Sequence, residues 1–137
     1  MSSATKLMAG LTLFLVPIIQ YGGYFLLTLL FDKRSGYMVN ALRQNLFRAG
    51  HAHAGVIIIL SLVCQILVDA SDLPKFFQWM VRVGVPVAAM LLSAGFFLSV
   101  LSPASTGPNR AVSLIYCGSL VLTVSVVTLG IGLLRAR

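Results

Sequence analysis

The sequence predicts an all-α integral membrane protein in which four transmembrane helices form a bundle. Hydrophobic residues make up 58% of the chain and charged residues 9%, with a mean hydropathy of +0.97. Soluble domains carry about a quarter charged residues. Four apolar stretches approach the length of about 20 residues that a bilayer crossing needs. The 137 residues are therefore expected to form one domain with lipid as its solvent.

Polar turns separate the four predicted spans. The spans cover about residues 7–31, 49–68, 81–101 and 111–134. In the first, Pro17 removes a backbone donor and is expected to kink the helix. Gln20, Tyr24 and Thr28 recur at every fourth position, so this mildly polar face is expected to contact a neighbouring helix rather than lipid.

Small residues mark two further contact faces. The Gly22-Gly23 pair of the first span permits a close helix approach, and Tyr116, Ser119, Thr123 and Gly130 share a face of the fourth. Small residues let helices approach closely in lipid. We expect both faces to pack, and the remaining apolar surface indicates a homo-oligomer or a subunit of a larger membrane complex.

The second span is expected to continue a helix that begins outside the bilayer. No proline occurs between Tyr37 and Val68, so one long helix extended beyond the bilayer is predicted. At about 100° per residue, a polar stripe follows one face of this helix. The stripe contains Asn40, Gln44, Arg48, His51, Gln65 and Asp69. Its last residue, Asp69, is expected to be a solvated helix cap.

The charges are arranged as membrane-surface anchors. The formal net charge is +7, and the Lys and Arg residues lie near the predicted helix ends, where lipid headgroups are met. No basic and aromatic stripe follows a soluble face, which argues against nucleic-acid binding. Basic residues divide evenly between the two sides, so orientation stays open. We expect a bacterial or organellar inner membrane.

His51 is the principal candidate for a functional residue. It shares the polar stripe with Arg48 and Gln44 near the membrane boundary. Its imidazole can ligate haem or a metal ion, relay protons or bind an anionic headgroup. The alternative is a histidine hydrogen-bonded to a neighbouring helix. His53 and Tyr24 complete the predicted cofactor-binding set; the alternative for His53 is a bond to a carbonyl or to the first span.

The residue types restrict the cofactor chemistry. His51 and His53 are two positions apart and point to nearly opposite helix faces, so they do not chelate one ion. A haem would need a methionine such as Met38, or a second subunit, for its other ligand. Zinc is disfavoured because no cysteine pair or nearby carboxylate accompanies either histidine. A phosphate-binding glycine loop, a catalytic triad and any glutamate are absent.

Two local resemblances add expectations. The segment from His51 through Ala52, His53 and Ala54 to Gly55 resembles histidine-rich helices of haem-copper oxidases and nitric oxide reductases. The size, the four spans and the Arg48-Ala49 pair are similar to the membrane-associated eicosanoid and glutathione metabolism family. That resemblance implies a trimer that binds glutathione at the start of helix two, although Ala52 stands where the family has an asparagine.

Two functions follow as expectations. The first is an accessory or oligomeric subunit of a membrane complex, of respiratory or redox type, whose His51 and Arg48 bind haem, a lipid headgroup or another cofactor. The alternative is a small membrane enzyme with a basic pocket for an anionic cosubstrate such as glutathione. That pocket would use Arg43, Arg48 and His51 together with Tyr24 or Tyr116.

Overall fold

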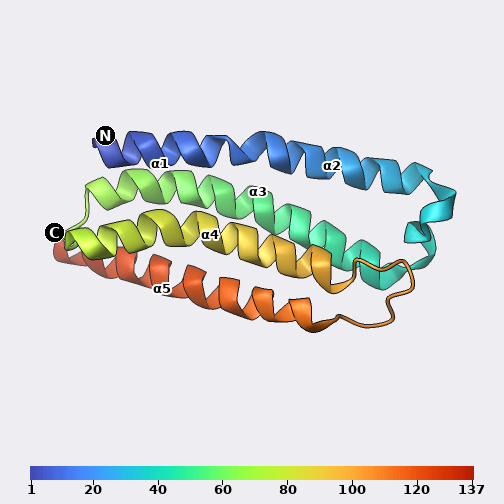
Figure 1. Ribbon diagram of the computed structural model, residues 1–137. Helices are drawn as coiled ribbons and strands as arrows, with labels where there is room; N and C mark the ends of the chain where they lie inside the picture. The colour runs from blue at the N-terminus through green and yellow to red at the C-terminus, as the bar shows by residue number, and fades with distance from the viewer.

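Four long spans lie side by side in the computed structural model, which describes residues 1–137 (Figure 1). They are α1 (Ser3–Leu13) with α2 (Leu15–Phe31), then α3 (Ala41–Asp69), α4 (Lys75–Ser99) and α5 (Ser113–Arg135). Each span is long and apolar enough to cross a bilayer. Both termini lie at the same end of the bundle, as an even number of crossings requires (Figure 1). The predicted all-α, four-span bundle is confirmed.

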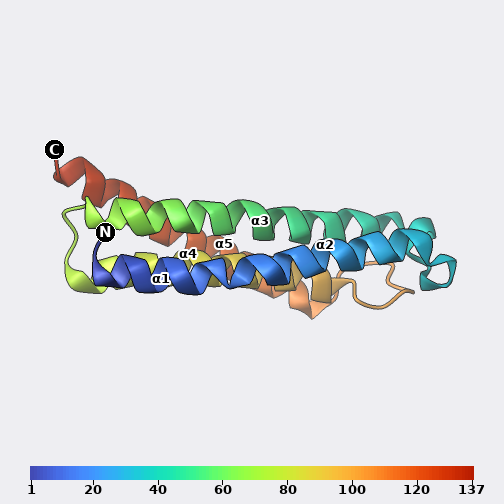
Figure 2. The same ribbon diagram turned by 90° about the horizontal axis from the view of Figure 1, so that it is seen from above.

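The first span is interrupted once. Phe14 separates α1 from α2, three residues before Pro17. Because Pro17 has no backbone N–H, the carbonyl of Leu13 loses its usual helical donor. The two helices nevertheless follow one another along the same edge of the bundle, and Figure 2 shows this span beside α3 along its length.

The helix α3 begins later than predicted but is long. Short 3-10 turns precede it as η1 (Lys33–Ser35) and η2 (Tyr37–Val39). Asn40 ends this segment because its side-chain oxygen accepts a 3.0 Å hydrogen bond from the backbone N–H of Arg43, which caps α3. The 29 residues of α3 span about 43 Å, more than the bilayer core of about 30 Å. The helix is therefore long enough for the predicted extension beyond the bilayer.

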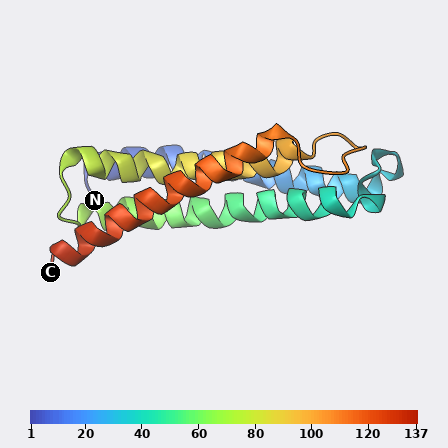
Figure 3. The same ribbon diagram turned by 90° about the horizontal axis from the view of Figure 1, so that it is seen from below.

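The tightest helix contact joins α4 to α5. A Cβ added at Gly95 would stand 2.8 Å from the backbone nitrogen of Ile115, and one at Gly118 would stand 3.0 Å from that of Leu92. Real Cβ atoms do not tolerate such distances to backbone, so glycine at both positions sets the closeness of the two helices. Figure 3 shows α5 crossing the bundle obliquely. The turn η3 (Arg110–Val112) leads into it.

The predicted contact face of the fourth span does not pack against another helix of this chain. Tyr116, Ser119 and Thr123 are exposed, and the buried positions are instead Gly118, Ser125, Leu129 and Gly132. The face with the smallest side chains allows the nearest backbone approach, so α5 turns its glycines toward α4 and the loop at Leu73.

The first span packs more loosely than the others. No residue of α2 is buried, whereas α3 and α4 supply most of the core. Gln20, Tyr24 and Thr28 are exposed, so the prediction that their face contacts a neighbouring helix was wrong within this chain. α2 meets α3 through the opposite face, which carries Gly22 and Gly23.

Candidate functional site

His51 lies where α3 faces the diglycine of α2. A Cβ added at Gly23 would stand 3.2 Å from both Cε1 and Nε2 of the imidazole, and one at Gly22 would stand 3.6 Å from Nδ1. The absence of side chains there leaves the room that the ring fills between the two helices. Neither nitrogen of His51 has a hydrogen-bond partner within the chain, since the one histidine hydrogen bond belongs to His53.

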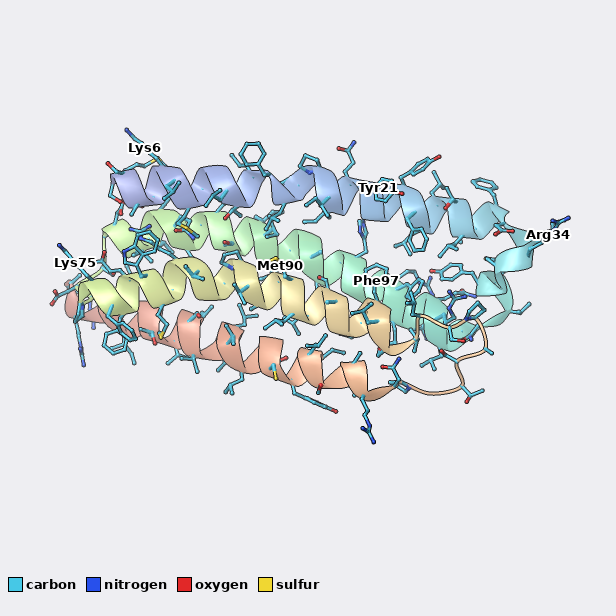
Figure 4. All side chains as sticks on the ribbon, viewed as in Figure 1. Lys6, Tyr21, Arg34, Lys75, Met90 and Phe97 are labelled. Atoms are coloured by element: carbon cyan, nitrogen blue, oxygen red, sulfur yellow. The ribbon has the colours of Figure 1, made fainter.

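A groove of about 410 Å³ runs beside His51. Small-molecule sites in proteins range from about 300 to 1,000 Å³. The groove is lined from α2 by Leu15, Ile18, Ile19, Tyr21, Gly22 and Phe25, from α3 by His51, Ala54 and Ile58, and from α4 by Ala89, Met90, Ser93 and Phe97. Figure 4 labels Tyr21 on one wall and Met90 and Phe97 along the other. Tyr21 and Met90 are exposed, so the groove opens sideways onto the outer surface of the bundle.

The two ends of the groove differ in chemistry. Phe25 and Phe97 lie at the end that holds His51, and both rings contact the buried ring of Phe47, with centroids 6.3 Å and 4.9 Å away. At the other end the lining is aliphatic and continues into the main core beside Ile58 and Ala89. The groove therefore has an aromatic end with an imidazole and a saturated hydrocarbon end.

Ser93 contributes a second polar group to the lining. Its Oγ is buried and has no hydrogen-bond partner. An unpaired hydroxyl in an apolar interior costs about 1–3 kcal/mol by mutational measures. Tyr21, His51 and Ser93 are thus the polar residues of the lining, and their side chains make no hydrogen bond within the chain, although almost all of the accessible surface of the groove is apolar.

Gln44 and Arg48 lie outside this groove. The side-chain amide of Gln44 donates to the carbonyls of Tyr37 and Met38, at 3.0 Å each. The exposed Arg48 donates to the carbonyl of Gln44 at 3.1 Å. Gln44 therefore ties the segment before α3 to that helix, Arg48 bonds within α3, and neither side chain is brought together with His51.

The other predicted site residues are dispersed. His53 lies within 2.7 Å of the carbonyl of Ala49 through Nδ1, and its ring centroid is 5.0 Å from that of Phe96. The carbonyl partner predicted as the alternative for His53 is thus its contact in the structure. Tyr24 and Tyr116 are exposed on outer faces, at 61% and 70%.

Arg43 also makes its hydrogen bonds away from His51. It is 5% exposed and donates to the carbonyls of Ser35, Val100 and Leu101, while its guanidinium lies 5.1 Å from the ring centroid of Phe47. It ties the start of α3 to the end of α4. Arg43, Arg48 and His51 do not form a common basic pocket.

A second polar cluster, which the sequence did not predict, lies at the other end of the bundle. Arg82 is 1% exposed and pairs with Asp69 at 2.7 Å. The same guanidinium donates to the hydroxyl of Thr5 at 2.7 Å, and Asp69 accepts a 2.7 Å bond from the backbone nitrogen of Ser2. Asp69 is solvent-accessible as predicted but is an ion-pair partner rather than only a cap, and the prediction of Arg82 as a headgroup anchor was wrong. This cluster joins the first span to α3 and α4.

Gln65 completes this cluster. Its Oε1 accepts from Arg82 at 3.2 Å, and its Nε2 donates to the backbone carbonyl of Arg82 at 2.8 Å. Two sequence signals could have found the cluster. Gln65 and Asp69 are four positions apart on one helix face, and Arg82 lies well inside α4, where a lone cation needs a partner.

Metal and haem sites are not favoured by this geometry. No three His, Cys, Asp or Glu side chains gather anywhere in the chain. At His51, the Cε1–Nε2 edge faces the backbone of α2, so a porphyrin plane on Nε2 would require α2 to move away. Comparison with protein-family models, curated proteins and solved structures gave no significant match to this chain. The two resemblances therefore rest on the residues quoted for them.

Proposed function

We propose that this chain is a small accessory subunit of a membrane assembly, and that it holds a membrane-soluble ligand in the groove beside His51. The observation that carries the proposal is the groove itself, about 410 Å³ between α2, α3 and α4. A groove open to the bilayer is filled by a hydrocarbon chain, because leaving it empty forfeits dispersion contacts on one side. The accessible lining of the groove is almost wholly apolar, which favours a hydrophobic occupant.

The outer faces of the bundle support the part of the proposal that concerns a subunit. Gln20 and Tyr24 on α2, and Ser119 and Thr123 on α5, are exposed on helices expected to cross the membrane. Amides and hydroxyls facing lipid are costly, and in membrane proteins such groups hydrogen-bond across helices. A second chain, either another copy or a different subunit, would supply those partners. A redox assembly in a bacterial or organellar inner membrane remains our proposal for the setting.

The enzyme alternative receives less support. It needs a basic pocket at the start of helix two. Arg43, however, donates its hydrogen bonds to backbone carbonyls, and Arg48 is exposed beside Gln44. An anionic cosubstrate such as glutathione would meet no free cation in the groove. The ligand-holding proposal uses the groove beside His51 as it stands.

Recovery of the bound molecule tests the proposal. The protein is purified in a mild detergent, extracted with organic solvent and analysed by mass spectrometry for a molecule in stoichiometric amount. Ala54→Phe fills the groove from α3, and Ala52→Phe adds the same bulk at an exposed position of that helix. We expect the molecule with wild type and Ala52→Phe and its loss with Ala54→Phe. Equal recovery from all three proteins, or from none, would contradict the proposal.

A further inference from the structure

We propose that a polar cavity at the end of the bundle where α4 begins binds the phosphate group of an anionic phospholipid. The cavity measures about 620 Å³, and more of its accessible lining is polar than apolar. Its lining includes Ser2 and Ala4 at the start of the first span, Asp69 of α3, and Lys75, Trp79 and Arg82 of α4. The cavity shares no lining residue with the groove beside His51, so it is a separate site.

Three side chains of α4 give the cavity its hydrogen-bond donors. Trp79 follows Lys75 by four positions and precedes Arg82 by three, a spacing that places all three along one helix face. Neither the ammonium of Lys75 nor the indole N–H of Trp79 makes a hydrogen bond within the chain. The two Nη atoms of Arg82 make all of its hydrogen bonds, so its Nε–H is also without a partner. Donors of this kind suit the oxygens of a phosphate group.

The charge of the cavity favours an anion. Asp69 is the only carboxylate in the lining, and its charge is paired with that of Arg82. It also accepts hydrogen bonds from the backbone nitrogen and hydroxyl of Ser2 and from the hydroxyl of Thr5. These four bonds use the acceptor capacity of a carboxylate. The positive charge of Lys75 is thus left over, whereas the ammonium group of a zwitterionic headgroup would find no free carboxylate.

The position of the cavity favours a lipid over a soluble phosphate. Figure 4 labels Lys75 at the end of the bundle, where the apolar helix α4 begins. Trp79 lines the cavity and is also exposed on the outer surface. Tryptophan side chains gather at the level of lipid headgroups, with the ring against acyl chains and the N–H toward polar groups. A phospholipid would therefore place its phosphate in the cavity and its acyl chains along the bundle.

Native mass spectrometry with lipids of one acyl composition tests the proposal. The full chain in a neutral detergent is titrated with dioleoyl phosphatidylglycerol, dioleoyl phosphatidylcholine and inorganic phosphate. We expect phosphatidylglycerol to bind about tenfold tighter than phosphatidylcholine, as one charge-assisted hydrogen bond implies. Lys75→Gln should remove this preference, and Lys75→Arg, which keeps the charge, should retain most of it.

Lys6→Gln is the matched control. Lys6 is an exposed cation at the same end of the bundle, but it does not line the cavity (Figure 4). Its loss should change the affinity for phosphatidylglycerol by less than about twofold, and circular dichroism verifies that each variant is helical. Equal losses from Lys75→Gln and Lys6→Gln, or no preference of the wild-type protein for phosphatidylglycerol, would overturn the site. Binding of inorganic phosphate as tight as that of phosphatidylglycerol would overturn the assignment to a lipid.

Discussion

The side-chain amide of Gln65 donates a 2.8 Å hydrogen bond to the backbone carbonyl of Arg82. That carbonyl lies four residues before Pro86, which has no N–H to give it. In a bilayer no water can replace the missing donor, so a neighbouring helix supplies one. A proline inside α4 is thus compatible with the membrane because α3 carries a glutamine at the matching height.

Gln65→Leu should therefore destabilise the bundle by about 2 kcal/mol, because it orphans a buried carbonyl and removes an acceptor from Arg82. Unfolding in mixed micelles followed by circular dichroism measures this loss. Gln20→Leu, at an exposed position without a hydrogen bond within the chain, is the matched control and should be near neutral for the monomeric chain in micelles. In the Gln65→Leu background, Pro86→Ala restores a helical donor and should recover part of the loss. If stability does not recover, the Gln65 amide does not replace the donor that Pro86 lacks.

Arg82→Met should release the amino-terminal half of the first span. The substitution leaves Asp69 without its cation and removes a donor to Thr5. Breaking a buried pair costs about 3–5 kcal/mol, and the 22% exposure of the Asp69 side chain places the expected loss at about 3 kcal/mol or below. Hydrogen exchange should rise in Ser3–Leu13 more than in α5. Lys75→Met, which removes an exposed cation without an ion pair, should leave exchange unchanged.

Gly23→Ala tests the contact between α2 and His51. The added Cβ would stand 3.2 Å from the imidazole edge, so the ring or α2 must shift. Overpacking of this kind costs about 1–3 kcal/mol. Gly10→Ala places the same methyl group where nothing lies within 4 Å, and its higher helix propensity should make it neutral or slightly stabilising. Equal stability of the two variants in the micelle assay would argue that His51 does not fill this space.

The raised pKa of Tyr37 predicts that the stability of the fold depends on pH in the alkaline range. Burial raises the pKa of Tyr37 above its ordinary value of 10.0, against the opposing charges of Arg48 and Arg43. As the pH climbs past 10, the unfolded chain loses the phenolic proton first, so the folded state binds more protons and stability falls with pH. The stabilising contribution of the protonated Tyr37 side chain is fully present below pH 10, the ordinary pKa. Tyr37→Phe should flatten this part of the pH profile, and an unchanged slope between pH 9 and 11 would contradict the assignment.

The fold could be predicted from the sequence because hydropathy and span length alone decide it. The positions of side chains around each helix were harder. His51 was identified because two histidines near a membrane boundary are conspicuous, but its partners were sought along its own helix. The structure places its neighbours on α2 and α4, and that pairing depends on the crossing of three helices.

The cluster at Arg82 was not predicted, for a related reason. Hydropathy placed the third span at about residue 81, which left Arg82 at the surface. In the structure α4 begins at Lys75, and Arg82, two turns inside it, is buried and reaches Asp69 across a short loop. Contact faces on α5 were likewise misplaced because hydroxyl-bearing residues were favoured over glycines, although only glycine permits the observed approach to Leu92 and Ile115.

The groove is tested most directly by the methyl signal of one methionine. The chain has five methionines, and among them only Met90 lines the groove. In methyl-¹³C-methionine NMR spectra, decylbenzene should shift the Met90 resonance at stoichiometric concentration and leave those of Met1, Met8, Met38 and Met80 in place. The shift should vanish in Ala54→Phe and persist in Ala52→Phe. Uniform shifts of all five signals, or an unmoved Met90, would contradict a ligand site between α2, α3 and α4.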